Sequence, residues 1–288
     1  MQLRVPSFRI PGHLLVLAAA CLWSLGGLLI KLLMGPFHVD PRAVACLRSA
    51  IAGIILSWAL PGISMAPRWK MLGAGLGYTV VVAGFVASTH LTSAANAIFL
   101  EYAYPLFVAI GAVLFFSERL GKRTLVALAL GMSGVATILI FGWTPGEGLG
   151  MVCGFSGAIG FAAFALFSRS IRYANPLGLS SAYNLMAAAI LFIPAWGTFG
   201  ISWGALLVLI ATATFQLGVP YALFIKGLRT IPATDAAIIT LAEPILNPVW
   251  VWLFLGEVPH MGTLVGGVLI LMALVARFTG APRRAELG

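Results

Sequence analysis

The chain has 288 residues, of which 61% are hydrophobic and 9% are charged, and it carries a formal net charge of +9. This composition, with a mean hydropathy of +1.04, excludes a water-soluble globular domain, because lipid must be the solvent for most of the surface. Strands of a membrane β-barrel would alternate polar and apolar residues over about ten positions, and no such pattern is present. The sequence therefore predicts an all-α integral membrane protein.

Apolar stretches of spanning length follow one another along the whole chain. A helix needs about 20 mainly apolar residues to cross a hydrocarbon core roughly 30 Å thick. The sequence predicts ten transmembrane helices, over residues 13–33, 42–60, 70–90, 94–116, 123–141, 149–169, 177–197, 203–226, 233–255 and 261–279. Because the connections are too short for a separate soluble domain, catalytic chemistry in a water-facing domain is not expected.

The first apolar stretch and the cysteines have simple interpretations. The stretch continues through Trp23 to Leu33 at full spanning length, which favours a retained helix over a cleaved signal segment. Cys21, Cys46 and Cys153 are odd in number, fall inside predicted helices and lack metal-ligand spacing. We therefore expect them to be small packing residues, and we expect neither a metal nor a cofactor.

The basic residues predict the orientation, because Lys and Arg near helix ends stay on the cytoplasmic side. With ten helices and a cytoplasmic N-terminus, all of the 17 basic residues except Lys31, Arg42 and Arg48 lie on that side, namely Arg4, Arg9, Arg68, Lys70, Arg119, Lys122, Arg123, Arg169, Arg172, Lys226, Arg229, Arg277, Arg283 and Arg284. We predict a multi-pass protein of the cell inner membrane with both termini in the cytoplasm. Because these charges lie in pairs at helix ends and form no single patch, binding to nucleic acid is not expected.

The chain contains an internal repeat. A shift of 139 residues places Pro105 on Pro244 and Glu118 on Glu257, and a shift of 138 places Trp23 on Phe161. The sequence thus predicts a cytoplasmic segment over 1–12, five-helix units over 13–141 and 149–279, and a cytoplasmic tail over 280–288. Because five is odd, the second unit is inverted in the membrane, and inverted repeats place a substrate site near the midplane between the halves.

Several motifs carry a resemblance to a known family over nearly the whole chain. They are Trp23-Ser24-Leu25-Gly26, Leu47-Arg48, Glu101-Tyr102-Ala103-Tyr104-Pro105, and the helix ends Ser117-Glu118 and Gly256-Glu257. By these the chain resembles the EamA family of the drug/metabolite transporter (DMT) superfamily, and within it the YddG-type amino-acid exporters. The resemblance implies a secondary transporter that exports or equilibrates small metabolites, most simply amino acids with aromatic or apolar side chains, by alternating access through a central cavity.

Three ionisable residues fall inside predicted helices, where a charge is costly unless it is paired or hydrated. They are Arg48, Glu101 and Glu243. One interpretation is that they line a water-filled cavity, where they meet the charges of a zwitterionic substrate or exchange a proton. The alternative is a buried ion pair between Arg48 and a glutamate that only fixes the packing of helices.

Prolines interrupt two of the predicted helices and mark hinge candidates. Pro244 and Pro248 each remove a backbone donor in the helix that carries Glu243, and Pro105 does the same one turn after Glu101. Thr240, Glu243 and Asn247 are spaced to share one helix face, which would turn three polar groups toward the same place. The alternative is an ordinary proline kink that aids packing.

Aromatic and amide side chains complete the predicted site. Rings inside helices could form a cavity wall for apolar substrates, while hydroxyls and amides orient polar groups; equally, they could serve only packing or helix contacts. The candidates are Trp23, Tyr78, Tyr102, Tyr183, Tyr221 and Gln216.

Other functions remain as alternatives. An exporter of lipophilic cations or drugs would need carboxylates and aromatic rings but not Arg48. Gly154-Phe155-Ser156-Gly157 resembles the nucleophile segment of intramembrane serine proteases, yet the same pattern recurs at Gly131-Met132-Ser133-Gly134, and the histidines lie at helix ends, so we expect no enzyme and no catalytic residue. A passive channel and a non-transporting receptor also stay open. The expected partners are a small-molecule substrate and the bilayer, as a monomer or an oligomer.

The charge distribution gives a first testable prediction. Single cysteines placed in a variant without native cysteines should react with a membrane-impermeant reagent from outside at residues 38 and 200. A cysteine in the loop 119–123 should react only after the membrane is permeabilised, because Arg119, Lys122 and Arg123 hold that loop in the cytoplasm. Labelling of this loop in intact cells would contradict the topology.

Overall fold

The computed structural model describes residues 10–63, 67–92, 94–141, 148–171, 173–256 and 261–278. Across these ranges every regular element is a helix, and no strand occurs among them. The first nine residues of the predicted N-terminal segment, the predicted tail 280–288 and Glu257 lie outside the described residues.

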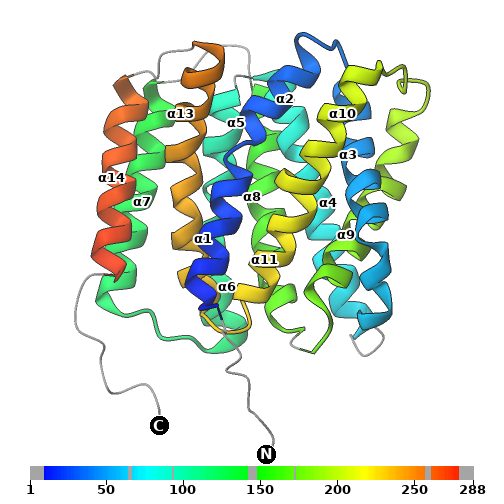
Figure 1. The fold of residues 1–288 in the computed structure, drawn as a ribbon. Coiled ribbons are helices and arrows are strands. Elements are labelled where there is room, and N and C mark those ends of the chain that lie inside the picture. The colour runs from blue at the N-terminus through cyan, green and yellow to red at the C-terminus, as the bar shows by residue number, and fades with distance from the viewer. Residues whose placement is uncertain are drawn as a thin grey trace, which may run out of the picture.

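The helices stand side by side as an upright bundle (Figure 1). In chain order the elements are α1 (Gly12–Trp23), α2 (Gly26–Met34), α3 (Pro41–Ile55), η1 (Ser57–Ile63), α4 (Arg68–Leu91), α5 (Ala94–Glu101), α6 (Tyr104–Phe116), α7 (Lys122–Phe141), α8 (Gly148–Arg169), α9 (Pro176–Ala195), α10 (Trp203–Ala211), η2 (Thr212–Gly218), α11 (Val219–Gly227), α12 (Ala233–Ile239), η3 (Thr240–Ala242), α13 (Glu243–Leu255) and α14 (Met261–Phe278). The elements η1 and η3 are 3₁₀-helices and η2 is a π-helix.

The helices are those of a multi-pass membrane protein. Among the described residues, six stretches are long and apolar enough to cross a bilayer, or seven if α3 and η1 form one span, while α6 and residues 264–273 are apolar but shorter. Each of the ten predicted ranges contains a helix, but the number of spans stays a prediction. The range predicted over 42–60 is not one continuous helix, because α3 and η1 meet at a bend of 71°. Pro61, inside η1, cannot donate the bond that would continue an α-helix.

Three prolines each follow a change in helix type. Proline has no N–H for the carbonyl four residues earlier. Pro105 follows the break between α5 and α6, Pro244 follows η3, and Pro220 follows η2. The carbonyls deprived of their normal α-helical donor are those of Glu101, Thr240 and Gln216, three of the predicted site residues.

The break between α1 and α2 has a different cause. The Ser24 hydroxyl donates to the carbonyl of Cys21 at 2.6 Å, a local bond that competes with the helix ladder. Gly26 and Gly27 follow after Leu25, and glycine is a poor helix former. From α13, the Trp250 indole donates to the Ser24 hydroxyl at 2.8 Å, so the break is held by a second helix.

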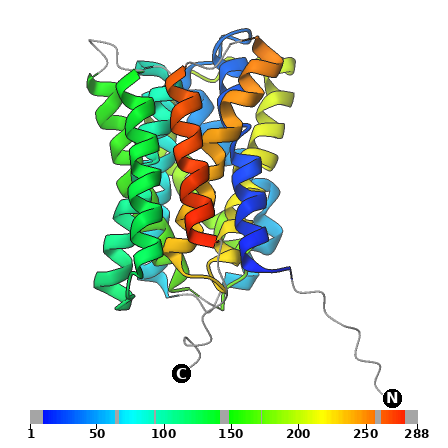
Figure 2. The same ribbon diagram turned by 90° about the vertical axis from the view of Figure 1, so that its left-hand side faces the viewer.

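The two halves run through the bundle in opposite directions. In Figure 1, α1 begins at the lower end and α14 ends there, whereas α8 begins at the upper end (Figures 1 and 2). Contacts between the halves join equivalent helices: α3 packs on α9, and α7 packs on α14. The contact of α4 with α8 has its counterpart in the contact of α11 with α1. Ser117 and Gly256, 139 residues apart, both end their helices in the left-handed conformation, with φ of 53° and 70°.

Helices α4 and α8 approach closely through glycines. A Cβ added to Gly77 would lie 2.6 Å from the Gly160 carbonyl oxygen and 2.8 Å from the Phe164 nitrogen, and one added to Gly160 would lie 2.7 Å from the Gly77 carbonyl oxygen. Because these neighbours are backbone atoms, they cannot give way as a flexible side chain would. This pair of helices is therefore a rigid wall of the bundle.

The contact predicts the effect of a single methyl group. Gly77→Ala should lower the free energy of unfolding by about 1–3 kcal/mol, because the added carbon overpacks the interface. Gly267→Ala is the matched control, since a Cβ at Gly267 in α14 meets nothing within 4 Å. Thermal melts of the two purified variants should show a loss only for Gly77→Ala. Equal melting temperatures of the two variants would contradict the close contact, because α4 and α8 would then accommodate the added methyl group without a loss in the free energy of unfolding.

Candidate functional site

One small cavity lies inside the bundle where the interrupted helices meet. Its lining comes from both halves, and the residues are Trp23, Arg48, Val81, Val82, Phe85, Ile98, Glu101, Tyr102, Tyr104, Phe161, Gln216, Leu217, Tyr221 and Glu243. The cavity volume is about 30 Å³, which is room for one or two waters. Sites for small molecules usually enclose about 300–1,000 Å³, so the structure shows a closed arrangement of these side chains.

The cavity contains one cation and two carboxyl groups, brought by three different segments. Arg48 from α3 is only 2% exposed, and its Nη1 donates to the side-chain oxygen of Gln216 in η2 at 3.3 Å. Among the described residues, no carboxylate lies within ion-pairing distance of this guanidinium. The structure thus shows a hydrogen bond to an amide in place of the buried ion pair that was the alternative interpretation.

The two glutamates have different surroundings. The Tyr102 hydroxyl faces the Glu243 carboxylate as a hydrogen-bond donor. Glu101 is close enough to Arg48 for electrostatic attraction, but its Oε2 is buried and has no hydrogen-bond partner among the described residues. An unsatisfied buried carboxylate oxygen is costly, so this side chain is available to a donor that enters the cavity.

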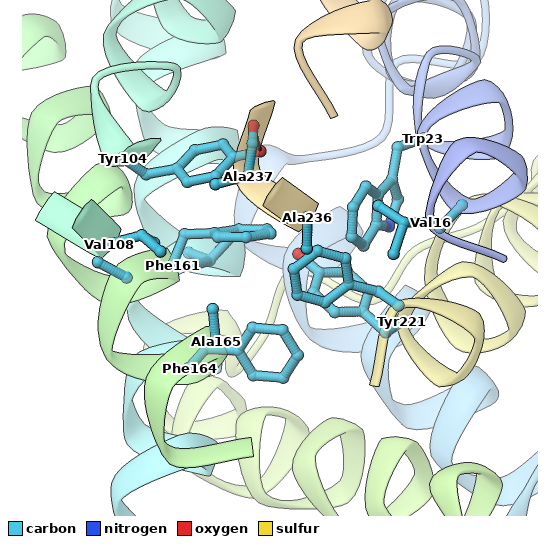
Figure 3. Close-up of a cluster of buried hydrophobic side chains, with 14 of the residues drawn as sticks. Val16, Trp23, Tyr104, Val108, Phe161, Phe164, Ala165, Tyr221, Ala236 and Ala237 are labelled. Atoms are coloured by element: carbon cyan, nitrogen blue, oxygen red, sulfur yellow. Dashed lines mark hydrogen bonds between the residues drawn. The ribbon is translucent and has the colours of Figure 1, made fainter. Parts of the chain in front are cut away.

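Aromatic rings form the apolar side of the cavity (Figure 3). Phe161 packs against Tyr104 with ring centres 4.2 Å apart and meets Trp23 edge-on at 5.7 Å. Trp23 in turn meets Tyr221 at 4.8 Å. These rings come from α1, α6, α8 and α11, so the cluster joins both halves beside the charged groups.

Glycines in α2 explain how two amide side chains reach the break between α1 and α2. A Cβ on Gly26 would lie 2.8 Å from the Gln216 amide nitrogen, and a Cβ on Gly27 would lie 2.5 Å from the Asn247 side-chain oxygen. Any larger residue would push these amides away. The Trp23-Ser24-Leu25-Gly26 motif therefore places Trp23 in the cavity, breaks the helix and admits Gln216.

Seven of the eleven predicted binding residues line the cavity: Trp23, Arg48, Glu101, Tyr102, Gln216, Tyr221 and Glu243. Tyr78, Tyr183, Thr240 and Asn247 do not appear in this lining. The shared face predicted for Thr240, Glu243 and Asn247 stays a prediction: Thr240 lies in the 3₁₀-helix η3, and Glu243 begins α13. The Thr240 hydroxyl donates to the Ala237 carbonyl, and Asn247 lies against Gly27.

Tyr78 and Tyr183 lie outside the cavity lining and pack against neighbouring aromatic rings. The Tyr78 ring meets Tyr221 at 4.6 Å, and its hydroxyl donates to the Asn184 side-chain oxygen at 2.7 Å. Tyr183 packs edge-on against Phe164 at 5.9 Å. Of the hinge candidates, Pro105 and Pro244 are the second residues of α6 and α13, and the side chain of Pro248 lies outside those described.

Sequence reasoning missed several lining residues, and two of them had a detectable signal. Phe161 aligns with Trp23 at the shift of 138, and Tyr104 aligns with Glu243 at the shift of 139. The repeat could therefore have named both. The aliphatic members, such as Val81 and Leu217, resemble any other apolar residue of a membrane helix and carried no signal.

In the described part of the chain, the serine hydroxyls of both glycine-serine segments form hydrogen bonds within their own helices. The Ser156 and Ser133 hydroxyls donate to carbonyls of their own helices, those of Cys153 and Ala129. Within the same ranges no group of three or more His, Cys, Asp and Glu residues could hold a metal ion.

Helices that cross a membrane and charged groups that face an internal cavity define a multi-pass membrane protein with a polar interior. A sequence model of the EamA-like transporter family matches the chain twice, over residues 10–140 and 148–278. The chain belongs to this family, and it is a membrane transporter of the DMT superfamily.

Relatives agree with this assignment, and a solved structure has the same fold. An uncharacterised transporter of Archaeoglobus fulgidus is 28% identical over 211 residues, 73% of this chain and 76% of that protein. The pseudopaline exporter CntI of Pseudomonas aeruginosa is 26% identical over 277 residues, 92% of this chain and 95% of that protein. A protein of known crystal structure has the same fold, with a TM-score of 0.78 and 18% identity, covering 93% of this chain and 97% of that one.

Proposed function

We propose that the protein is a secondary transporter that exports or equilibrates amino acids, with aromatic or apolar side chains preferred, by alternating access through the central cavity. The observation that carries the proposal is the cavity lining itself: Arg48, Glu101 and Glu243 come from three segments and lie beside a wall of aromatic rings. A zwitterion with an apolar side chain offers the three complementary features, a carboxylate, an ammonium group and a hydrophobic surface.

The interrupted helices support the same substrate class. Helices α2, α6 and α13 each begin inside the bundle, at Gly26, Tyr104 and Glu243. The N-terminus of a helix carries partial positive charge, and unwound carbonyls carry partial negative charge. With Arg48 they supply positive potential for a carboxylate, while Glu101 and Glu243 supply negative potential for an ammonium group.

Topology and direction complete the proposal. Ten helices in two inverted repeats, in the cell inner membrane with both termini cytoplasmic, agree with the opposite directions of the two halves in Figure 1 and with the charge bias of the sequence. The named pseudopaline exporter among the relatives favours export. The narrower likeness to YddG-type amino-acid exporters belongs to the same proposal, as does a single small-molecule partner with no nucleic acid bound.

The main alternative is a transporter of lipophilic cations. The two carboxyl groups and the aromatic rings would suit such a substrate. Arg48, however, would repel it from the same cavity, and no carboxylate of the described residues neutralises this guanidinium through an ion pair. The position of Arg48 therefore favours a substrate with a negative group.

A counterflow screen tests the proposal. Liposomes containing only the purified protein and loaded with unlabelled phenylalanine should accumulate labelled phenylalanine, and the same assay with lipophilic cations should give no signal. Arg48→Leu should abolish the amino-acid signal, because it removes the cation that meets the carboxylate. Counterflow of cations without amino acids would establish the alternative, and no counterflow of any metabolite would contradict transport by this cavity.

Glu243 gives a second prediction, because it is the carboxyl group that lies at the start of a helix inside the bundle. If it meets the substrate ammonium group or carries a proton, Glu243→Gln keeps its volume and removes its charge, so flux or its pH dependence should be lost. Arg48 bonds to Gln216 and not to Glu243, so the melting temperature should change little.

Glu118→Gln is the comparison for a carboxylate with a structural role. Glu118 accepts a hydrogen bond from Arg169 in an ion pair outside the cavity lining, with side chains 17% and 15% exposed. Loss of that charge-assisted bond should lower the free energy of unfolding by about 1.5–3 kcal/mol. Transport per folded molecule, measured over a pH series, separates the two roles, and wild-type flux in Glu243→Gln would remove Glu243 from the site.

A further inference from the structure

A second hollow lies on the outer face of the bundle, between α6 and α7. Its floor is formed by Ala109 and Leu128, which are 2% and 7% exposed. Its volume is about 570 Å³, and its walls include Leu106, Ile110, Val113, Leu125, Ala129 and Met132. Leu106, Ile110 and Leu125 are between 42% and 52% exposed, so the groove opens toward the surrounding hydrocarbon.

The groove exists because two consecutive helices have different neighbours. Helix α6 packs against α8 and α12, whereas α7 packs mainly against α14. Helices α6 and α7 make few contacts with each other. Their apolar side chains therefore face a space that no other described helix fills.

The lower end of the groove has a strong positive charge. Leu120, in the loop between α6 and α7, belongs to the lining, and Arg119, Lys122 and Arg123 flank it. All three basic side chains are exposed, and none forms an ion pair with another described residue. This loop lies at the end of the bundle where α1 begins and α14 ends (Figure 1). The charge bias predicts that this end faces the cytoplasm.

We propose that the groove and its basic loop form a binding site for one anionic phospholipid of the cytoplasmic leaflet. The phosphate lies among Arg119, Lys122 and Arg123, and an acyl chain lies along the leucines and isoleucine of α6 and α7. Basic clusters at the cytoplasmic ends of membrane helices attract anionic headgroups in this way. A second copy of the chain fits less well, because a two-fold contact through this face would set two basic loops beside each other.

Native mass spectrometry of the full-length protein tests the proposal. The protein in detergent is titrated with phosphatidylglycerol or phosphatidylcholine of the same acyl chains, and bound lipid is counted. One phosphatidylglycerol should bind in preference to phosphatidylcholine. Arg119→Gln/Lys122→Gln/Arg123→Gln should weaken its binding at least about tenfold, since each basic residue near the headgroup contributes a factor of about five. Equal binding of the two lipids would overturn the proposal.

Two further variants separate the site from general charge effects. Arg68→Gln/Lys70→Gln/Lys226→Gln removes three basic residues that the charge bias also predicts to be cytoplasmic and that do not line the groove, and it should keep the preference. Ala129→Phe fills the groove and should weaken phosphatidylglycerol binding with all charges present. A loss in the control variant equal to that in the loop variant, or unchanged binding by Ala129→Phe, would contradict the site. Binding of glycerol phosphate equal to that of the lipid would also contradict it, because the acyl chain would then contribute nothing.

Discussion

The need to satisfy backbone polar groups away from water governs the structure. In hydrocarbon every N–H and C=O requires a partner within the protein, and an unbroken α-helix supplies these partners by itself. Wherever this chain breaks a helix it must find others. It does so in the interior: the Ser24 hydroxyl donates to the Cys21 carbonyl, and η2 makes a widened helical turn, while the Trp250 indole donates to the Ser24 hydroxyl from α13. Most of these breaks lie beside the cavity. Irregular backbone is excluded from a lipid-facing surface, so in this chain it lies around one small internal space, together with the partial charges of its unpaired groups.

One pair of helices in the bundle is regular and held by direct backbone contact. Helices α4 and α8 are unbroken, and Gly77 and Gly160 bring their backbones into contact. A cavity of about 30 Å³ must enlarge severalfold before it can hold an amino acid. We propose that the interrupted segments α1–α2, α5–α6, α10–α11 and α12–α13 are the elements that move when the cavity enlarges, because α4 and α8 are held by backbone contact. Pro105, Pro220 and Pro244 lie at their joints, where a missing hydrogen bond lowers the resistance to bending.

Much of this arrangement follows from local sequence. Apolar length located the helices, and the pairing of Pro105 with Pro244 located the repeat and two of its breaks. Arg48, Glu101 and Glu243 were identified as site residues because a charge inside a membrane helix has few inexpensive explanations. The bend at Leu56 and the π-helix at η2 depend on how turns accommodate Pro61 and Pro220, which sequence spacing alone does not reveal. Likewise, polarity and spacing did not reveal that Glu243 lines the cavity while Thr240 bonds to the Ala237 carbonyl and Asn247 lies against Gly27. The choice of Gln216 as the partner of Arg48 required the tertiary structure, because the two lie 168 residues apart.

The repeat is symmetric in its backbone but not in its cavity. Ser117 and Gly256 keep the same left-handed conformation at equivalent positions, yet at the shift of 139 Glu101 corresponds to Thr240 and Glu243 to Tyr104. At the shift of 138 Arg48 corresponds to Met186, so the second half has no matching cation. A carrier made of two identical inverted halves would show the same site to both sides of the membrane and would have equal half-saturation concentrations for its two directions. In this chain the two halves share a backbone arrangement but differ in their cavity residues. If transport uses this cavity, as we propose, a solute meets different side chains from each side of the membrane, and its half-saturation concentrations for entry and exit can differ.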